Sequence, residues 1–505
     1  MAETIVVVGA GIAGLCCALA LGRSGQEIVV LERDAPPPSG GTDDAFRDWK
    51  RGGVGHLRQS HAFLARLRNI VRTDHPRLLE DLAAHGVRDL PFEGMLSELQ
   101  RDSYRPRPSD AELTIITSRR TTLELVMRRY VEGLPNVAIR PSVFVRGLLT
   151  ERGEDGRLKV TGVRADETGR EVEIRADVVV DAGGKGGILI DQLREAGARI
   201  PEFNETAGIL YFTRHYRLKP GRTEPPRIGN PPSGGDLGFL KFGVFPADNG
   251  CFSITMCTPE IEYEMRKAIV DPETFQAMTQ MLPGLRPWTD PDQAEPTSKV
   301  FGMGDLICRW RDMVADGQPA TLGYFAVGDN LVRTNPLYGR GCSFAAVAAY
   351  RLRDVLAAST DPATRAHAYH DAITEDLRPF FDLMLKQDRD AVKRARAALT
   401  PGHRPSFKAR LAKSFAEDGI AVAVRYDVDL LREAMRGFHM LEHPEAWLKK
   451  PRNMVRVLGY WARGKKRNAR AYPPKAGPER EEMMQALGLD PKADIALAAA
   501  ERAAA

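Results

Sequence analysis

Residues 5–14 read IVVVGAGIAG, and residues 28–32 read IVVLE. The pattern predicts a buried strand, a glycine-rich turn, a helix and a second strand that ends at an acid. Gly9 permits a turn too tight for a Cβ atom, Gly11 lets the backbone approach a pyrophosphate, and Gly14 lets the helix lie close to the first strand. Such a unit is typical of a dinucleotide site.

The helix after the turn, over residues 12–23, would point its unpaired amides at the phosphates, among them those of Ile12 and Ala13. Glu32 stands at the separation from the turn expected of the carboxylate that accepts the ribose hydroxyls, with Arg33 beside it. A carboxylate there would repel a 2′-phosphate, which favours ADP-ribose over its phosphorylated form. The motif alone leaves FAD and NAD open.

The composition is that of a globular protein. The chain has 505 residues, of which 43% are hydrophobic and 28% are charged, enough for two or three structural units. No apolar run approaches the ~20 residues of a membrane span, and we expect no signal peptide before the first strand. The six cysteines show no metal-ligand spacing, so a reduced, cytoplasmic protein without a structural metal is expected. A net charge of +5 does not suggest nucleic acid as a partner.

Further along the chain, the pattern predicts that the nucleotide domain is not contiguous. Helical periodicity resumes near Ser60, and another helix is expected over 121–132. Short apolar strands at 176–184 and 325–329 fit the same buried parallel sheet. Longer alternating strands between about 205 and 260 would form a separate antiparallel sheet.

We therefore expect an α/β fold in which a Rossmann-like nucleotide domain carries an inserted antiparallel sheet and a helical C-terminal region. The expected boundaries are 1–200 for the first part of the nucleotide domain, with inserted strands and helices, 201–300 for the substrate-domain sheet, 301–370 for the second part of the nucleotide domain, and 371–505 for the helical region.

The stretch 328–341, GDNLVRTNPLYGRG, decides between the two nucleotides. Asp329, at the end of a strand, would hydrogen-bond a ribityl hydroxyl or, through water, the pyrophosphate. The amides after Gly341 form a positive helix end that stabilises negative charge on the N1 and O2 side of a reduced isoalloxazine. Because NAD has no such need, the stretch predicts FAD. The residues expected to bind it here are Gly328, Asp329, Pro336, Gly339, Gly341 and Cys342.

With these motifs the chain resembles the single-Rossmann FAD-dependent monooxygenase superfamily, which includes the aromatic hydroxylases and lipid epoxidases. Within it the chain is most similar to the bacterial squalene-type and polyether epoxidase branch. Residues 53–64 are similar to a G-V-P-Q-x-R-H-x-H-x-L-L segment, 211–216 to Y-x-x-R-x-Y, and 335–342 to N-P-x-Y-G-Q-G-M. The resemblance implies an enzyme that uses FAD and O2, through a flavin C4a-hydroperoxide, to epoxidise or hydroxylate a lipophilic unsaturated or aromatic metabolite.

The chain also departs from that pattern. The superfamily's A-D-G element, which is implicated in FAD and nicotinamide binding, is replaced by DAGGK at 181–185. Electrons could therefore come from NAD(P)H or from a separate flavin reductase. His56 stands where the branch has Gln, Gln59 where it has His, Arg340 where it has Gln, and Cys342 where it has Met.

The resemblance also suggests individual site residues. Arg120 would contact FAD from the R-x-x-L start of a helix, with Arg119 as the alternative. Arg58 would face the flavin or form a surface ion pair. His61 would hydrogen-bond flavin or substrate, or serve the core as many lone histidines do. Tyr338 would pack on the isoalloxazine or within the core.

The segment 445–467 mixes aromatic and aliphatic residues with Lys and Arg. On a helix, Met454, Val457, Leu458 and Trp461 share one face. Such a helix would either lie on an anionic membrane, which would place the protein at the inner face of the membrane, or dock on the main domain.

Other functions stay open at this stage. An FAD-dependent reductase or dehydrogenase of the geranylgeranyl-reductase type has the same motifs and no need for oxygen. A flavin halogenase is less favoured because the W-x-W-x-I-P motif is absent. A non-catalytic lipid escort of this fold is disfavoured by the intact glycines of both motifs.

Overall fold

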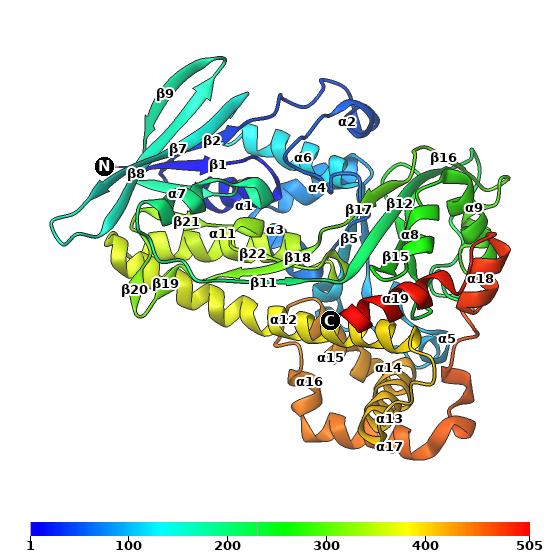
Figure 1. The fold of residues 1–505 in the computed structure, drawn as a ribbon. Helices are drawn as coiled ribbons and strands as arrows, with labels where there is room; N and C mark the ends of the chain where they lie inside the picture. The colour runs from blue at the N-terminus through cyan, green and yellow to red at the C-terminus, as the bar shows by residue number, and fades with distance from the viewer. Residues whose placement is uncertain (1, 230, 505) are drawn as a thin grey trace.

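The computed structural model describes residues 2–229 and 231–504 (Figure 1). At its centre lies a parallel sheet with the strand order β21–β10–β1–β2–β6. Its strands are β1 (Thr4–Val8), β2 (Glu27–Glu32), β6 (Val137–Pro141), β10 (Val178–Asp181) and β21 (Tyr324–Ala326). Strands from distant parts of the chain thus share one sheet. The expected α/β fold with a Rossmann-like sheet is confirmed.

The first helix of the sheet domain is apolar on every side. In α1 (Ile12–Leu21) every residue except Ala13 is buried. It packs against α11 (Gly341–Ala358) and also contacts α6 (Arg120–Glu132). A helix surrounded in this way must be hydrophobic all round, which explains why its sequence shows almost no amphipathic period.

Two excursions leave the parallel sheet. Between β2 and β6 the chain forms α2 (Thr42–Asp48), α3 (Ala65–Asp74), α4 (Pro76–Ala84) and α6. It also forms a small sheet in the order β3 (Ala62–Phe63), β5 (Ile115–Thr117), β4 (Arg88–Leu90). Between β6 and β10 it forms an antiparallel meander of β7 (Val143–Arg152), β8 (Leu158–Glu167) and β9 (Arg170–Arg175), which stands out from the molecule in Figure 1.

The second large sheet is antiparallel and two-faced. β12 (Ile209–Leu218) pairs with β15 (Cys251–Pro259), which pairs with β14 (Lys241–Pro246). One face carries Phe212 and Met256 into a core shared with α8 (Tyr263–Ala268), α9 (Pro272–Met281) and α10 (Arg286–Thr289). The opposite face carries Tyr211 and Cys257 into the core of the parallel-sheet domain. This sheet therefore covers the nucleotide domain with one of its faces. Its other strands are β13 (Gly234–Asp236), β16 (Ala294–Pro296) and β17 (Phe301–Met303).

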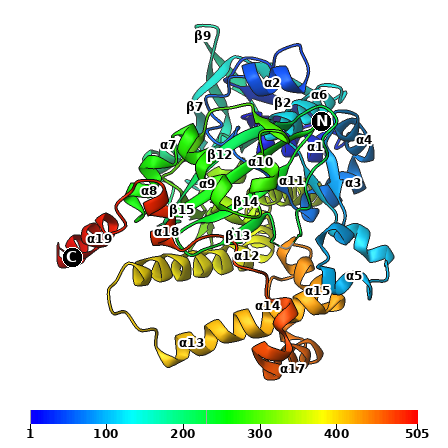
Figure 2. The same cartoon turned by 90° about the vertical axis from the view of Figure 1, so that its right-hand side faces the viewer.

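The C-terminal region begins with a helix of 37 residues, α12 (Pro362–Ala398), which runs along the lower side of both sheets in Figure 1. α12 starts before the expected boundary at residue 371. The later helices gather at the lower end of the molecule (Figure 2). These are α13 (Phe407–Ser414), a π-helical turn at Phe415–Ile420, α14 (Ala421–Tyr426), α15 (Val428–Phe438), α16 (Ala446–Lys449) and α17 (Pro451–Arg467).

Among the remaining elements, β11 (Glu202–Thr206), β18 (Ile307–Arg311) and β22 (Val332–Arg333) form a three-stranded antiparallel sheet, and β19 (Val314–Ala315) pairs with β20 (Gln318–Pro319). The other helices are α5 (Glu98–Arg101), α7 (Leu189–Glu195), α18 (Arg480–Ala486) and α19 (Ala493–Ala504).

One expected helix starts later than its periodicity suggested. Helical structure was expected from Ser60, whereas α3 begins at Ala65. Ala62 and Phe63 instead pair with β5, and the Ser60 side chain bonds to the antiparallel sheet. Long-range pairing therefore outweighs local periodicity here. No helix in the described part of the chain is long and apolar enough to cross a membrane.

Candidate functional site

The three glycines of the first turn meet different surroundings. Gly9 has φ +98°, and a Cβ atom there would lie 2.7 Å from the carbonyl oxygen of Ala182. A Cβ on Gly14 would lie 1.8 Å from the carbonyl oxygen of Gly9. A Cβ on Gly11 would meet nothing within 4 Å. The backbone at Gly11 is thus open to a ligand at the N-terminus of α1, where unpaired amides favour a phosphate.

Glu32 is 3% exposed and lies against this turn. It accepts hydrogen bonds from the amide of Ala10 at 2.8 Å and from Arg51 at 2.9 Å. Arg51 also contacts Glu124 at 3.1 Å and Asp34 at 3.3 Å. Arg51 has no local signal in the sequence, because its partners lie up to 73 residues away. Its guanidinium holds the predicted ribose carboxylate in place.

Arg33 has a more open position than Glu32. Its side chain is 40% exposed and lies 3.9 Å from the carboxylate of Asp34. Its guanidinium also lies close over the backbone of Gly53. It stays a predicted contact of the adenosine half of the cofactor.

Arg119 and Arg120 point to different partners. Arg119 donates to Asp248 and contacts Asp43, which ties α6 to the antiparallel sheet and to α2. Arg120 donates to Glu124 at 2.6 Å and lies 3.3 Å from Nε2 of His61. Burial lowers the pKa of Arg120, but the charge and hydrogen bond of Glu124, together with the charges of Cys342 and Asp329, leave that pKa raised. Arg120 therefore points toward His61, whereas Arg119 points toward the antiparallel sheet. The contact of Arg120 with FAD stays a prediction.

His61 and its neighbours form a stack of rings beside Arg120. The His61 ring lies 5.9 Å from that of His56 and 5.8 Å from that of Phe63. Burial and the charge of Arg120 lower the pKa of His61 to about 3, and the same two causes lower that of His56. Nδ1 of His61 therefore donates to the Gln59 carbonyl, and Nε2 accepts from Arg120.

Arg58 lies at the end of α2. It donates to the carbonyl of Phe46 at 3.0 Å and to those of Arg47 and Trp49 at 3.3 Å. These contacts give the guanidinium a structural role in the described chain. A contact with flavin stays a prediction.

The stretch 328–341 approaches the glycine-rich turn of residues 9–14 at Gly328. Gly328 has φ +67°, and a Cβ there would lie 2.8 Å from Cβ of Ala13. Asp329 follows in a 3₁₀ turn. The positive charges of Arg333 and Arg120 oppose the rise in the pKa of its carboxyl group that burial causes. Arg333 is 8% exposed, and its Nη1 is buried without a hydrogen-bond partner among the described residues. Nη2 of the same guanidinium donates to the Asp305 carbonyl at 3.3 Å, so the free Nη1 fits an anionic or polar ligand at this place.

The loop before α11 is fixed from below by α12. The Tyr338 hydroxyl donates to Oδ1 of Asp388 at 2.9 Å, and the side-chain Nδ2 of Asn335 donates to the same atom at 2.8 Å. Tyr211 donates to Asn335 at 2.6 Å. Gly339 ends the 3₁₀ turn Pro336–Tyr338 in the left-handed region, at φ +64°. Asp388 was not expected from the sequence, because nothing marks it on a long helix. The Tyr338 hydroxyl is thus engaged, and the guanidinium of Arg340 lies over its ring, 5.3 Å from the ring centroid. Packing of this ring on the isoalloxazine stays a prediction.

A chain of hydroxyl groups lines the face of the antiparallel sheet that covers the nucleotide domain. Thr213 donates to Gln59 at 2.6 Å and lies 2.7 Å from Thr255. Thr255 donates to Ser60 at 2.6 Å, and Ser60 lies 2.6 Å from Ser253. The alternation of side chains along β12 was the sequence signal available for this face. Thr213 points toward the nucleotide domain, whereas its neighbours Phe212 and Arg214 point to the opposite face of the sheet.

His215 on this face leads to a prediction about pH. It is 3% exposed, its Nε2 lies 2.9 Å from the Arg58 carbonyl, and burial lowers its pKa to about 4. In the unfolded chain His215 takes up a proton near pH 6.5, whereas in the folded chain it does so only near pH 4. The free energy of unfolding is therefore kept above about pH 6.5 and decreases as the pH falls below it. From pH 7 to pH 5 this residue should cost about 2 kcal/mol of unfolding free energy.

Urea unfolding of the wild type and of His215→Asn at the two pH values tests this. The variant should lose about 2 kcal/mol less than the wild type between pH 7 and pH 5. Equal losses in the two proteins would show that His215 titrates normally in the folded chain.

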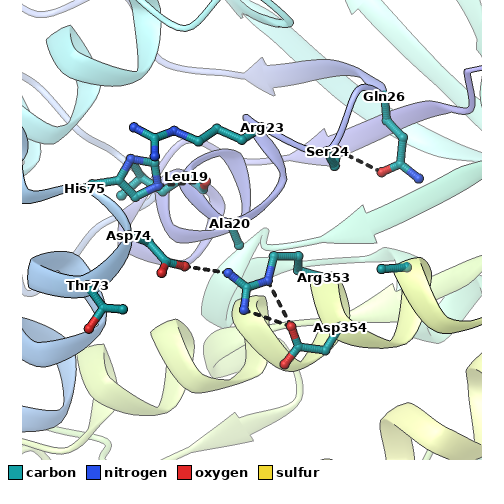
Figure 3. Close-up of a pocket in the computed structure, with 11 residues that line it drawn as sticks. Leu19, Ala20, Arg23, Ser24, Gln26, Thr73, Asp74, His75, Arg353 and Asp354 are labelled. Carbon is teal, nitrogen blue, oxygen red and sulfur yellow. Dashed lines mark hydrogen bonds and ion pairs between the residues drawn. The ribbon is translucent and has the colours of Figure 1, made fainter.

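A cavity of about 450 Å³ lies elsewhere, beside the C-terminal end of α1 (Figure 3). Its walls include Arg23, Asp74, His75 and Arg353, and Asp74 pairs with Arg353. The glycine turn is at the opposite end of α1, about 15 Å away for a helix of ten residues. The cavity is therefore separate from the nucleotide site.

Together these residues fit FAD. The open backbone at Gly11 and the orphaned Nη1 of Arg333 mark two places where the described chain lacks a partner. The adenosine half would be held by Gly9, Gly11, Ile12, Ala13, Gly14, Glu32 and Arg33. The flavin half would be held by Arg120, Gly328, Asp329, Pro336, Gly339, Gly341 and Cys342.

Comparisons with known proteins bear on the fold and the family of this chain. The chain is 29% identical over 375 residues to Protein Rv3254 of Mycobacterium tuberculosis, which covers 70% of this chain and 73% of that protein. The flavin-dependent brominase Bmp2 shares the fold at 18% identity, with a TM-score of 0.59 over 92% of this chain and 100% of that one. The anhydrotetracycline hydroxylase OxyS of Streptomyces rimosus shares it at 17% identity, with a TM-score of 0.55 over 87% of this chain and 76% of that one. The sequence profile of the FAD dependent oxidoreductase family (DAO) matches residues 4–355. The chain belongs to this family and is an FAD-dependent enzyme, an oxidoreductase.

Proposed function

We propose that the enzyme is a monooxygenase that epoxidises or hydroxylates a lipophilic unsaturated or aromatic metabolite. The observation that carries this proposal is the ring stack of His61 with His56 and Phe63 beside Arg120, whose guanidinium disfavours a charged imidazole there. His61 has its pKa lowered to about 3 and His56 has its pKa lowered as well, so neither is an imidazolium near neutral pH. Reduction of a carbon–carbon double bond needs a proton donor beside the hydride source. Oxygen transfer needs mainly a dry, oriented site.

Bound FAD, once reduced, supplies the two electrons that activate O2. One oxygen atom enters the substrate, and the other leaves as water with two protons. The residues of the protein would bind and orient the cofactor and the substrate. Arg120 and the amides of α1 would hold the phosphates, and the α11 N-terminus would stabilise charge on the flavin ring. The solved hydroxylase of this fold supports hydroxylation as the outcome.

We further propose that a separate flavin reductase supplies the electrons. Where the superfamily has A-D-G, Asp181 is fully buried and accepts from Tyr324 at 2.7 Å and from the amide of Gly183 at 2.9 Å. Because the carboxylate is already engaged in these bonds, we expect that it does not bind a nicotinamide. NADPH alone should therefore reduce the purified holoenzyme much more slowly than NADPH with an added flavin reductase.

The test is to reduce the FAD-loaded enzyme with light under anaerobic conditions and to mix it with O2. A transient absorbing species before oxidised flavin returns is expected, because a dry site delays the loss of peroxide. Direct return to oxidised flavin with stoichiometric hydrogen peroxide would contradict monooxygenation and favour the reductase function. Bromide-dependent halogenation of added phenols would favour a halogenase, and failure to bind FAD would favour a lipid escort.

A further inference from the structure

Two acid-free segments give the C-terminal region its charge. Residues 391–416 contain seven Lys and Arg and no Asp or Glu. Residues 446–478 contain ten Lys and Arg and again no acid. The whole chain carries a net charge of only +5, so the rest of the protein is acidic on balance. Positive charge is thus concentrated in two stretches that are well separated in the sequence.

The fold brings the two stretches to one end of the molecule. α13 and α17 both lie at the lower end in both views (Figure 1 and Figure 2). Trp461 of α17 packs on Phe415 with ring centroids 5.4 Å apart, and its Nε1 donates to Ser414 at 3.1 Å. The end of α13 is therefore fixed against α17, and the positive charges of both add to one surface.

α13 is the most exposed element of this surface. No residue of the helix is buried. Phe407 is 70% exposed and Leu411 is 46% exposed. Because they are four residues apart, they lie on the same face of the helix. Large apolar side chains in this position, flanked by Lys408 and Arg410, have no covering partner among the described residues.

α17 is docked on one side and open on the other. Val457 is fully buried and Trp461 packs on Phe415, so part of the predicted apolar face of 445–467 docks on the helical region, whereas Leu458 of that face does not. Val455, at 69% exposure, and Leu458, at 43%, point outward instead. The outward face thus repeats the pattern of α13, with apolar side chains among basic ones.

Many of the basic side chains at this end are available to a partner. Lys465 pairs with Asp418 at 3.6 Å, and Arg456 pairs with Asp427. Others form no ion pair with a described acid. These are Arg404, Lys408, Arg410, Arg452, Lys466 and Arg467.

We propose that this basic end binds the surface of an anionic lipid bilayer, with Phe407 and Leu411 of α13 inserted below the headgroups. Basic residues attract anionic lipid, and exposed apolar side chains between them gain from burial at the acyl boundary. A nucleic acid would be attracted by the same charges and could stack a base on Phe407, but it offers no apolar phase in which Phe407 and Leu411 would be buried together. The inference goes beyond the proposed reaction, because it concerns a surface and needs no turnover.

The experiment is co-sedimentation of the FAD-loaded enzyme with vesicles of phosphatidylcholine alone or with phosphatidylserine added. The wild type should partition onto the anionic vesicles and release at high salt. Phe407→Ser with Leu411→Ser should weaken partition about tenfold, because two apolar side chains lose their burial. Replacing Arg404, Lys408 and Arg410 by Gln should weaken it as well.

A matched control is Ile188→Ser with Val270→Ser, which removes two side chains of 45% and 49% exposure outside this end. The control should bind vesicles as the wild type does. Equal partition of the wild type and the Phe407/Leu411 variant would overturn the proposal. Binding of single-stranded RNA that depends on the arginines but not on Phe407 and Leu411, without vesicle binding, would overturn it in favour of a nucleic-acid surface. The flavin absorbance of every variant reports the cofactor site separately, so failure here leaves the proposed reaction untouched.

Discussion

Gly14→Ala is expected to unfold the nucleotide domain partly and to yield protein without FAD. The added Cβ would lie 1.8 Å from the carbonyl oxygen and 2.9 Å from the carbonyl carbon of Gly9, and both are backbone atoms that cannot turn aside. α1 would have to move away from β1, although it is buried on nearly every side. Overpacking of this kind costs about 3 kcal/mol. Thermal unfolding and the FAD content of the purified protein measure the effect.

Gly11→Ala is the matched control for that change. It adds the same methyl group three residues earlier, where nothing lies within 4 Å. The apo protein should unfold like the wild type, whereas the affinity for FAD should fall at least about tenfold, because the methyl group would stand between the backbone and the pyrophosphate. Wild-type affinity in Gly11→Ala would contradict the placement of the pyrophosphate over this turn.

The sequence allowed prediction of those parts of the site that are built from neighbours in the chain. The turn at Gly9, the acid at Glu32 and the loop before Gly341 each depend on a few consecutive residues, because a glycine conformation or a helix end is a local property. Strand alternation likewise located β12 and β15 within a few residues. The sheet and its discontinuous strands followed from these elements.

The parts that escaped prediction depend on residues that are far apart. Arg51 meets Glu124 across 73 residues, Thr213 meets Gln59 across 154, and Asn335 meets Asp388 across 53. A single arginine or aspartate has no periodic signal, since its role is fixed by what the fold places opposite it. The exposed face of α13 escaped for the opposite reason. Apolar residues four apart on a short helix look like a buried face until the structure shows nothing packed on them.

Arg120→Met is expected to weaken FAD binding strongly and to destabilise the protein. Glu124 has no exposed surface, and loss of Arg120 leaves its Oε1 without the partner that donates at 2.6 Å. Breaking one partner of a buried ion pair costs about 3 kcal/mol or more. His61 also loses the donor to its Nε2. The FAD affinity, followed by quenching of flavin fluorescence, should fall at least about tenfold as one phosphate contact is lost.

Arg119→Met separates stability from cofactor binding. Arg119 serves Asp248, which is fully buried and also accepts from Thr122 at 3.0 Å. Its loss should cost about 3 kcal/mol of unfolding free energy, as for Arg120. The flavin affinity of the folded protein should stay at the wild-type value, because Arg119 ties α6 to the antiparallel sheet rather than to the nucleotide. If both variants weakened FAD binding equally, the loss would reflect a disturbed α6 in general. A loss confined to Arg120→Met would show that two adjacent arginines, indistinguishable in the sequence, divide folding and cofactor binding between them.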